Sequence, residues 1–177
     1  LLRVGEPISY DGEIGLASSE PGNFARWWRG GQGAAIPIRS DLGLDGRIRV
    51  TAEEIAMPAL QLTAAGTTLL GSLRYRTPKP DVRGALDLDL RAERLDAAPL
   101  VALAQALAID RPDPAALSEV GSDVTLDLTA DTARYAEAEG QGLTVAASLI
   151  DGAFTLERFE IADLAGARLA GSGAFAL

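Results

Sequence analysis

The sequence contains no cysteine and no histidine, and only 5% of its residues are aromatic. These absences remove the commonest general base of enzymes, the thiol nucleophile, disulfide cross-links and the ligands of ordinary zinc sites. A Ser-His-Asp triad is excluded as well, since it needs the imidazole. We therefore predict no catalytic residue, no metal site and no cofactor, and classify the chain as non-enzymatic.

Basic residues are also scarce, with 16 Lys and Arg against 25 Asp and Glu and a net charge of -9 at pH 7. Proteins that bind nucleic acid need a cluster of basic residues on one face, so no nucleic-acid partner is predicted. No stretch approaches the roughly 20 apolar residues that cross a bilayer, and no signal-peptide pattern is present. We expect this chain to be a piece of a longer protein whose membrane anchor lies outside it.

Apolar residues, which make up 47% of the chain, recur at every second position in several segments. The clearest segments are 86–91, 124–129 and 143–149. Each predicts a strand with one apolar and one polar face, as in an antiparallel sheet with one side in water. Asp-Gly pairs at 11–12, 45–46 and 151–152 predict hairpin turns between such strands. The fold class is therefore mainly β, an antiparallel sheet of repeated hairpins.

Two local features interrupt this regular alternation. Between Phe154 and Ile161 the apolar positions change parity, which predicts a bulge near Arg158. Leu100, Leu103, Ala104 and Leu107 recur at helical spacing, which predicts one amphipathic helix from Asp96, as N-cap, to about Ala108. One or two short helical turns are expected as well, beginning at Asn23 and at Asp113.

An internal repeat links the two halves of the chain. Residues 65–75 and 165–175 share the frame A-G-x-x-L-x-G-S-x-x-aromatic at a constant offset of 100 residues. A repeated β unit suggests an extended array in which each unit packs against its neighbours. We therefore divide the chain into a first β repeat, residues 1–80, and a second, residues 81–177, which includes the helix.

The order of these segments resembles the C-terminal region of AsmA-family proteins. The resemblance is carried by D-L-D-L-R-A-E-R-L-D-A-A-P-L (87–100), D-V-T-L-D-L-T-A (123–130), G-Q-G-L-T-V-A-A-S-L-I-D-G-A-F-T-L (140–156) and A-G-A-R-L-A-G-S-G (165–173). It implies an elongated, curved β-sheet in the periplasm of a Gram-negative bacterium, tethered to the inner membrane. It also implies a role in outer-membrane biogenesis and phospholipid movement between membranes, with kinship to TamB-like and bridge-like lipid-transfer proteins.

The alternating residues supply the candidate site, an apolar strip on one sheet face. Its expected partners are phospholipid acyl chains and neighbouring β repeats of the longer protein. The alternative is that these residues form an ordinary core, covered by the helix from Asp96 to Ala108 or by a second layer. The strip comprises Leu86, Leu88, Leu90, Val124, Leu126, Leu128, Leu143, Val145 and Leu149.

Two other classes of function stay open at this point. A carbohydrate-binding or adhesin-like surface domain would require exposed aromatic residues arranged as a platform for sugars. A glycosidase would require two carboxylates across a cleft, for which Asp87 and Asp127 are the candidates. Alternating Asp residues are more typical of a solvated strand face that discourages aggregation.

Overall fold

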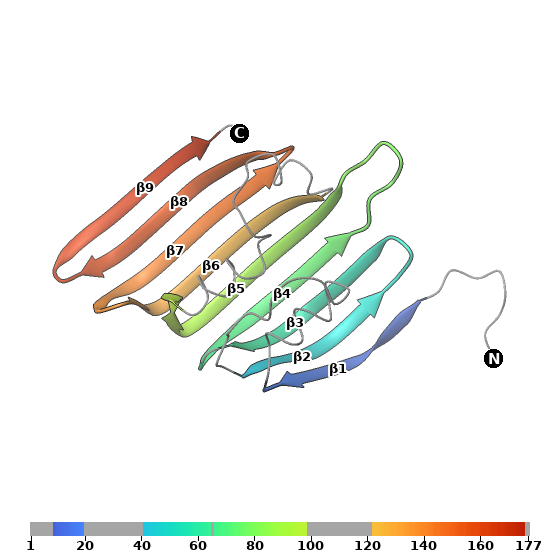
Figure 1. The fold of residues 1–177 in the computed structure, drawn as a ribbon, viewed down its shortest axis with the longest axis horizontal. Helices are drawn as coiled ribbons and strands as arrows, with labels where there is room; N and C mark the ends of the chain where they lie inside the picture. The colour runs from blue at the N-terminus through green and yellow to red at the C-terminus, as the bar shows by residue number, and fades with distance from the viewer. Residues whose placement is uncertain (1–8, 20–40, 65, 99–121, 176–177) are drawn as a thin grey trace.

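The computed structural model describes residues 9–19, 41–64, 66–98 and 122–175, which contain nine β-strands (Figure 1). The mainly β prediction is confirmed. The strands are β1 (Tyr10–Ser18), β2 (Leu42–Val50), β3 (Glu54–Ala64), β4 (Thr67–Arg76), β5 (Gly84–Asp96), β6 (Ser122–Tyr135), β7 (Ala138–Ile150), β8 (Ala153–Leu164) and β9 (Ala167–Phe175).

The nine strands form one open sheet whose spatial order follows the sequence, with β1 at one edge and β9 at the other (Figure 1). All neighbours pair antiparallel except β5 and β6, which are parallel. The prediction of a purely antiparallel sheet is therefore wrong at this one pair. Parallel neighbours need a crossover of a dozen or more residues, and the β5–β6 connection, 97–121, has that length.

Within the described part of the chain, the sheet is a single layer. Substantial contacts between described strands all join neighbours in the sheet. Most apolar side chains are consequently half-buried, and the buried cluster is small; it consists of Leu69, Ala92, Leu95, Ala130 and Leu143.

The turn predictions are partly confirmed. Asp151 and Gly152 both have positive φ, 51° and 79°, as the type I′ turn between β7 and β8 requires. The other two Asp-Gly pairs lie inside β1 and β2, so the turns predicted there are wrong. At Gly46 the reason is packing, because a Cβ would overlap the carbonyl oxygen of Ala59 on the neighbouring strand.

The bulge predicted near Arg158 is confirmed. Ala146 pairs with Arg158 and Ala147 with Leu156, so Glu157 is the extra residue on β8. A β-bulge bends a strand and changes which face its later residues occupy. For this reason Phe154 and Phe159 lie on the same face although their positions differ in parity.

The helix predicted from Asp96 to Ala108 lies mostly outside the described residues. Its proposed N-cap is the last residue of β5, and Asp96 Oδ1 accepts a hydrogen bond from the Ala98 amide at 3.3 Å. The short turns at Asn23 and Asp113 also lie outside the described residues. The division into repeats 1–80 and 81–177 stays a prediction, with its boundary in the β4–β5 connection.

Candidate functional site

The nine predicted strip residues lie on one face of the sheet, on three adjacent central strands. Partners in a β-ladder point to the same face, and the registers pair Leu86 with Val124, Leu88 with Leu126, and Leu90 with Leu128 across β5 and β6. The next register pairs Val124 with Leu149 and Leu128 with Val145, while Leu143 is opposite Ala130. The structure therefore brings all nine together, which places them but leaves their role as a prediction.

These residues belong to longer rows that cross the whole sheet, from β1 to β9. One row passes through Leu90, Leu128 and Val145; in strand order it is Ile14, Gly46, Leu60, Gly71, Leu90, Leu128, Val145, Phe159 and Gly171. A second row has a side chain on every strand; it is Tyr10, Val50, Ile55, Tyr75, Leu86, Val124, Leu149, Phe154 and Phe175. We call the surface formed by these rows and the strip residues the apolar face.

Sequence reasoning missed the half of the apolar face that β1 to β4 contribute. The signal was present, since Leu42 to Val50 alternates as clearly as the later strands. It was lost because Asp45-Gly46 was interpreted as a turn, which split one strand into two short ones. On β8 the bulge hid the contribution of Phe159, whose parity is opposite to that of Phe154.

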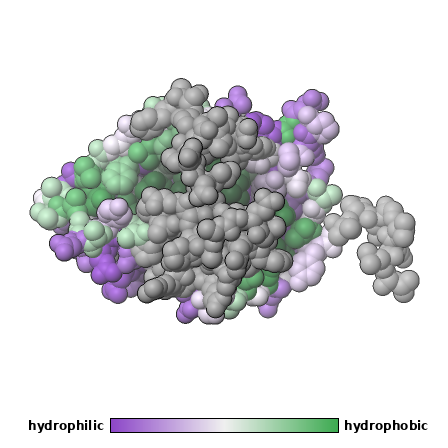
Figure 2. Space-filling view, in the orientation of Figure 1, coloured by the Kyte–Doolittle hydropathy of each residue, from purple (hydrophilic) through white to green (hydrophobic). Residues whose placement is uncertain are grey.

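Burial on the apolar face is greatest near the centre of the sheet and least at its edges. Leu143 on β7 is only 7% exposed, whereas Leu169 on β9 is 45% exposed and Ile14 on β1 is 37% exposed. The other eight strip residues are half-buried. In Figure 2, the coloured part of the face toward the viewer shows hydrophobic residues gathered together and hydrophilic residues mainly at the periphery.

The opposite face is charged and is held by ion pairs between strands. Arg47 Nε donates to Asp11 Oδ1 at 2.8 Å, joining β2 to β1, and Arg134 donates to Asp96 Oδ2 at 2.7 Å, joining β6 to β5. The hydrogen bond from Arg47 lowers the pKa of the Asp11 carboxyl, and that from Arg134 lowers the pKa of Asp96. These exposed pairs contribute little stability individually but give this face its fixed polarity.

Asp87 and Asp127, the carboxylates of the glycosidase alternative, lie on this charged face. Both border a shallow depression of about 440 Å³. Asp87 pairs in register with Thr125 and accepts a hydrogen bond from Arg76 at 3.2 Å, while Asp127 is opposite Asp89. The arrangement is that of cross-strand neighbours on an open sheet face.

Hydrogen bonds to the Asp123 carboxylate join three segments: the β4–β5 connection, the start of β6 and the β7–β8 turn. Asp123 Oδ1 accepts hydrogen bonds from the Asp151 amide at 3.0 Å and from Arg83 Nε at 2.9 Å. The amide bond, followed by the guanidinium, lowers the pKa of Asp123 below its ordinary value of 3.8. The side chains of Asp123 and Arg83 are 30% and 34% exposed, so water screens this pair less than the other ion pairs.

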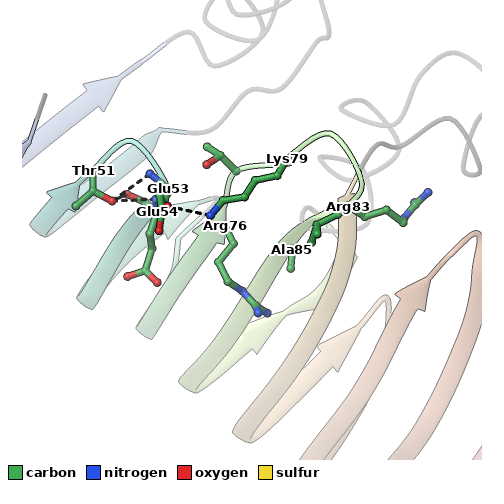
Figure 3. A pocket seen from close by; sticks show the side chains of 9 residues that line it. Thr51, Glu53, Glu54, Arg76, Lys79, Arg83 and Ala85 are labelled. Atoms are coloured by element: carbon green, nitrogen blue, oxygen red, sulfur yellow. Dashed lines mark hydrogen bonds and ion pairs between the residues drawn. The ribbon is translucent and has the colours of Figure 1, made fainter. Parts of the chain in front are cut away.

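A second polar depression, of about 530 Å³, lies between the β2–β3 and β4–β5 connections (Figure 3). Thr51 Oγ1 accepts hydrogen bonds from the amides of Glu53 and Glu54, which forms the turn before β3. Lys79 Nζ donates to Glu53 Oε1 at 2.9 Å and lowers the pKa of that carboxyl. These contacts tie two connections together, which is a structural role.

The exposed tyrosines do not form a common platform of the kind a sugar-binding domain uses. Tyr10, 52% exposed, starts β1 at the sheet edge, while Tyr135, 59% exposed, ends β6. The row of Tyr10 crosses β6 at Val124, near the opposite end of that strand. Among the described residues, no three His, Cys, Asp or Glu side chains gather as metal ligands.

The described residues include no helix with the length and hydropathy of a membrane span. Comparison of the chain with protein-family models, with curated proteins and with solved structures gives no match. The described residues define the class as an open, mostly antiparallel β-sheet, whose strands form one layer with one apolar and one charged face. With no matching protein, a proposal about function depends on the chemistry of these two faces.

Proposed function

We propose that this chain is a segment of an AsmA-like envelope protein whose apolar face accommodates phospholipid acyl chains. The observation that carries the proposal is the continuity of the apolar rows across all nine strands of a single-layer sheet. An ordinary core would need a cover, either the predicted helix or a second layer, and the described strands form one layer. In this proposal the longer protein is periplasmic and tethered to the inner membrane, and its curved sheet takes part in outer-membrane biogenesis.

The dimensions of the face suit such a ligand. Strands lie about 4.8 Å apart, so nine of them span about 38 Å, whereas the acyl chains of one leaflet occupy about 15 Å. Each methylene removed from water contributes about 0.8 kcal/mol, so a partial contact with one chain is enough for binding. The side chains that would meet it are mostly Leu, Ile and Val, and their flexible or branched surfaces suit a ligand without polar groups.

The charges of the opposite face support an orientation. Carboxylates and guanidinium groups alternate there in cross-strand pairs, so that face stays in water. A phospholipid would therefore lie against the apolar face with its headgroup at the margin of the sheet. Neighbouring β repeats of the longer protein would continue the same face.

The absence of cysteine makes a direct test possible. We would compare Leu128→Cys and Thr129→Cys, each labelled with an environment-sensitive fluorophore, because these neighbours on β6 point to opposite faces. The chain would be mixed with phosphatidylethanolamine that carries a nitroxide on one acyl chain. We expect quenching of the label at position 128 and little quenching at position 129. Equal quenching at both positions, or none at position 128, would contradict the proposal.

A further inference from the structure

The edge strand β9 is the structural repeat of an internal strand, β4. Their hairpins share a glycine turn, with φ of 77° at Gly66 and 85° at Gly166, and both carry a bulge on the first strand. The β8–β9 pair has a second register shift, between Ile161 and Leu164, that the β3–β4 pair lacks. The registers correspond, since Leu62 pairs with Leu69 as Ile161 pairs with Leu169, and Leu60 with Gly71 as Phe159 with Gly171. The sequence repeat at an offset of 100 residues is thus a repeat of structure as well.

The two hairpins differ in what lies beyond them. β4 has an antiparallel neighbour on its second side, β5, whereas β9 ends the order of described strands. The effect on exposure is large: Leu69 is 4% exposed, while its equivalent Leu169 is 45% exposed. An unpaired strand edge offers a row of backbone donors and acceptors to another strand.

Two equivalent glycines, Gly71 on β4 and Gly171 on β9, indicate what kind of neighbouring strand the β9 edge can bind. A Cβ at Gly71 would overlap the carbonyl oxygen of Asp89 and lie 3.0 Å from the Leu90 Cα, so the close approach of β5 requires glycine there. At Gly171 a Cβ would meet no atom within 4 Å. The described structure therefore places no demand for glycine at position 171, although a strand bound as β5 is bound would create one.

We infer that the outer edge of β9, which has no partner among the described strands, binds an antiparallel strand in the register that β5 adopts on β4. The strand would place apolar side chains beside Leu169 and polar or acidic ones on the charged face, as Leu86 to Leu90 alternates with Asp87 and Asp89 in β5. It would approach Gly171 as closely as Asp89 approaches Gly71. Recognition by strand addition combines main-chain hydrogen bonds with such alternate side-chain contacts.

This inference concerns the edge of the sheet and does not depend on lipid binding by its face. The test uses a fluorescent peptide with the β5 sequence, residues 84–96, titrated with the whole 177-residue chain and followed by fluorescence anisotropy. The control ligand is a peptide of the same composition in which the alternation of apolar and polar residues is removed by scrambling the order. We expect the β5 peptide to bind and the scrambled peptide to bind more weakly.

Two glycine variants make the test specific. Gly171→Ala should leave the fold intact, because its Cβ meets open space, but weaken peptide binding by about tenfold or more through the clash with the incoming backbone. Gly173→Ala also meets open space, and its equivalent on β4 is Leu73, which pairs with β5. Gly173→Ala should therefore bind the peptide like the parent chain.

The outcomes against the inference are equally defined. Absence of peptide binding, or equal binding by the Gly171→Ala variant and the parent chain, would overturn it. Self-association of the chain that Gly171→Ala abolishes, with the peptide unbound, would assign the edge to a second copy instead. Because the fluorophore experiment reports on β6 and this one on β9, failure of either proposal is seen separately.

Discussion

Truncation of two leucines on one row offers a direct test of how the apolar face is packed. Leu143 on β7 pairs with Ile161, which in turn pairs with Leu169 on β9. The two leucines therefore differ mainly in their distance from the edge. Leu143 is 7% exposed and belongs to the buried cluster, whereas Leu169 is 45% exposed.

The expected costs follow from these exposures. Leu143→Ala removes a nearly buried side chain and leaves a cavity, which costs about 3 kcal/mol of unfolding free energy. Leu169→Ala removes a side chain that buries only about half its surface at an open edge, which costs about 1 kcal/mol. With a urea dependence of about 1 to 3 kcal/mol per molar, the two midpoints should differ by about 1 M.

The assay is urea unfolding of the parent chain and both variants, followed by far-ultraviolet circular dichroism. Midpoints that do not change with protein concentration would show that association at the β9 edge does not protect Leu169. Equal costs for the two truncations would refute the reasoning, because the central part of the apolar face would then be no better packed than its edge.

Three further outcomes are expected. Gly71→Ala should lower the free energy of unfolding by about 1 to 3 kcal/mol, because its Cβ overlaps the Asp89 carbonyl, while Gly171→Ala leaves the urea midpoint unchanged. Acidification from about pH 6 to about pH 2.5 should lower the urea midpoint, because Asp96 and Asp123 have folded pKa values below their ordinary 3.8 and the unfolded chain takes up protons first. Asp123→Asn should reduce this pH dependence. Asp127→Asn serves as the comparison, because Asp127 forms no ion pair with another described residue. Ala165→Gly should raise the free energy of unfolding by about 0.5 to 1 kcal/mol. Ala165 has a φ of 54°, a backbone conformation that is unfavourable for any residue with a Cβ. A lower urea midpoint would contradict that account.

The alternation of apolar and polar residues was sufficient to predict the mainly β fold class and the shared face of the nine strip residues. A strand projects successive side chains to opposite faces, so Leu86, Leu88 and Leu90 had to share one face wherever the strand lay. The parity change after Phe154 likewise predicted the bulge on β8, because an inserted residue is the local way to restore alignment. These are properties of neighbouring residues, and the sequence contains them directly.

Pairing and packing were decided only by the tertiary structure. The parallel alignment of β5 with β6 depends on the path of a long connection, and the roles of Gly46 and Gly71 depend on which backbone lies beside them. The same dipeptide, Asp-Gly, is a turn at 151–152 and part of a strand at 45–46, because a glycine serves both tight turns and close strand approach. The sequence determined that this protein is a two-faced sheet. The fold determined how far each face extends and which strands form the edges of the described sheet, since both depend on contacts between residues distant in the chain.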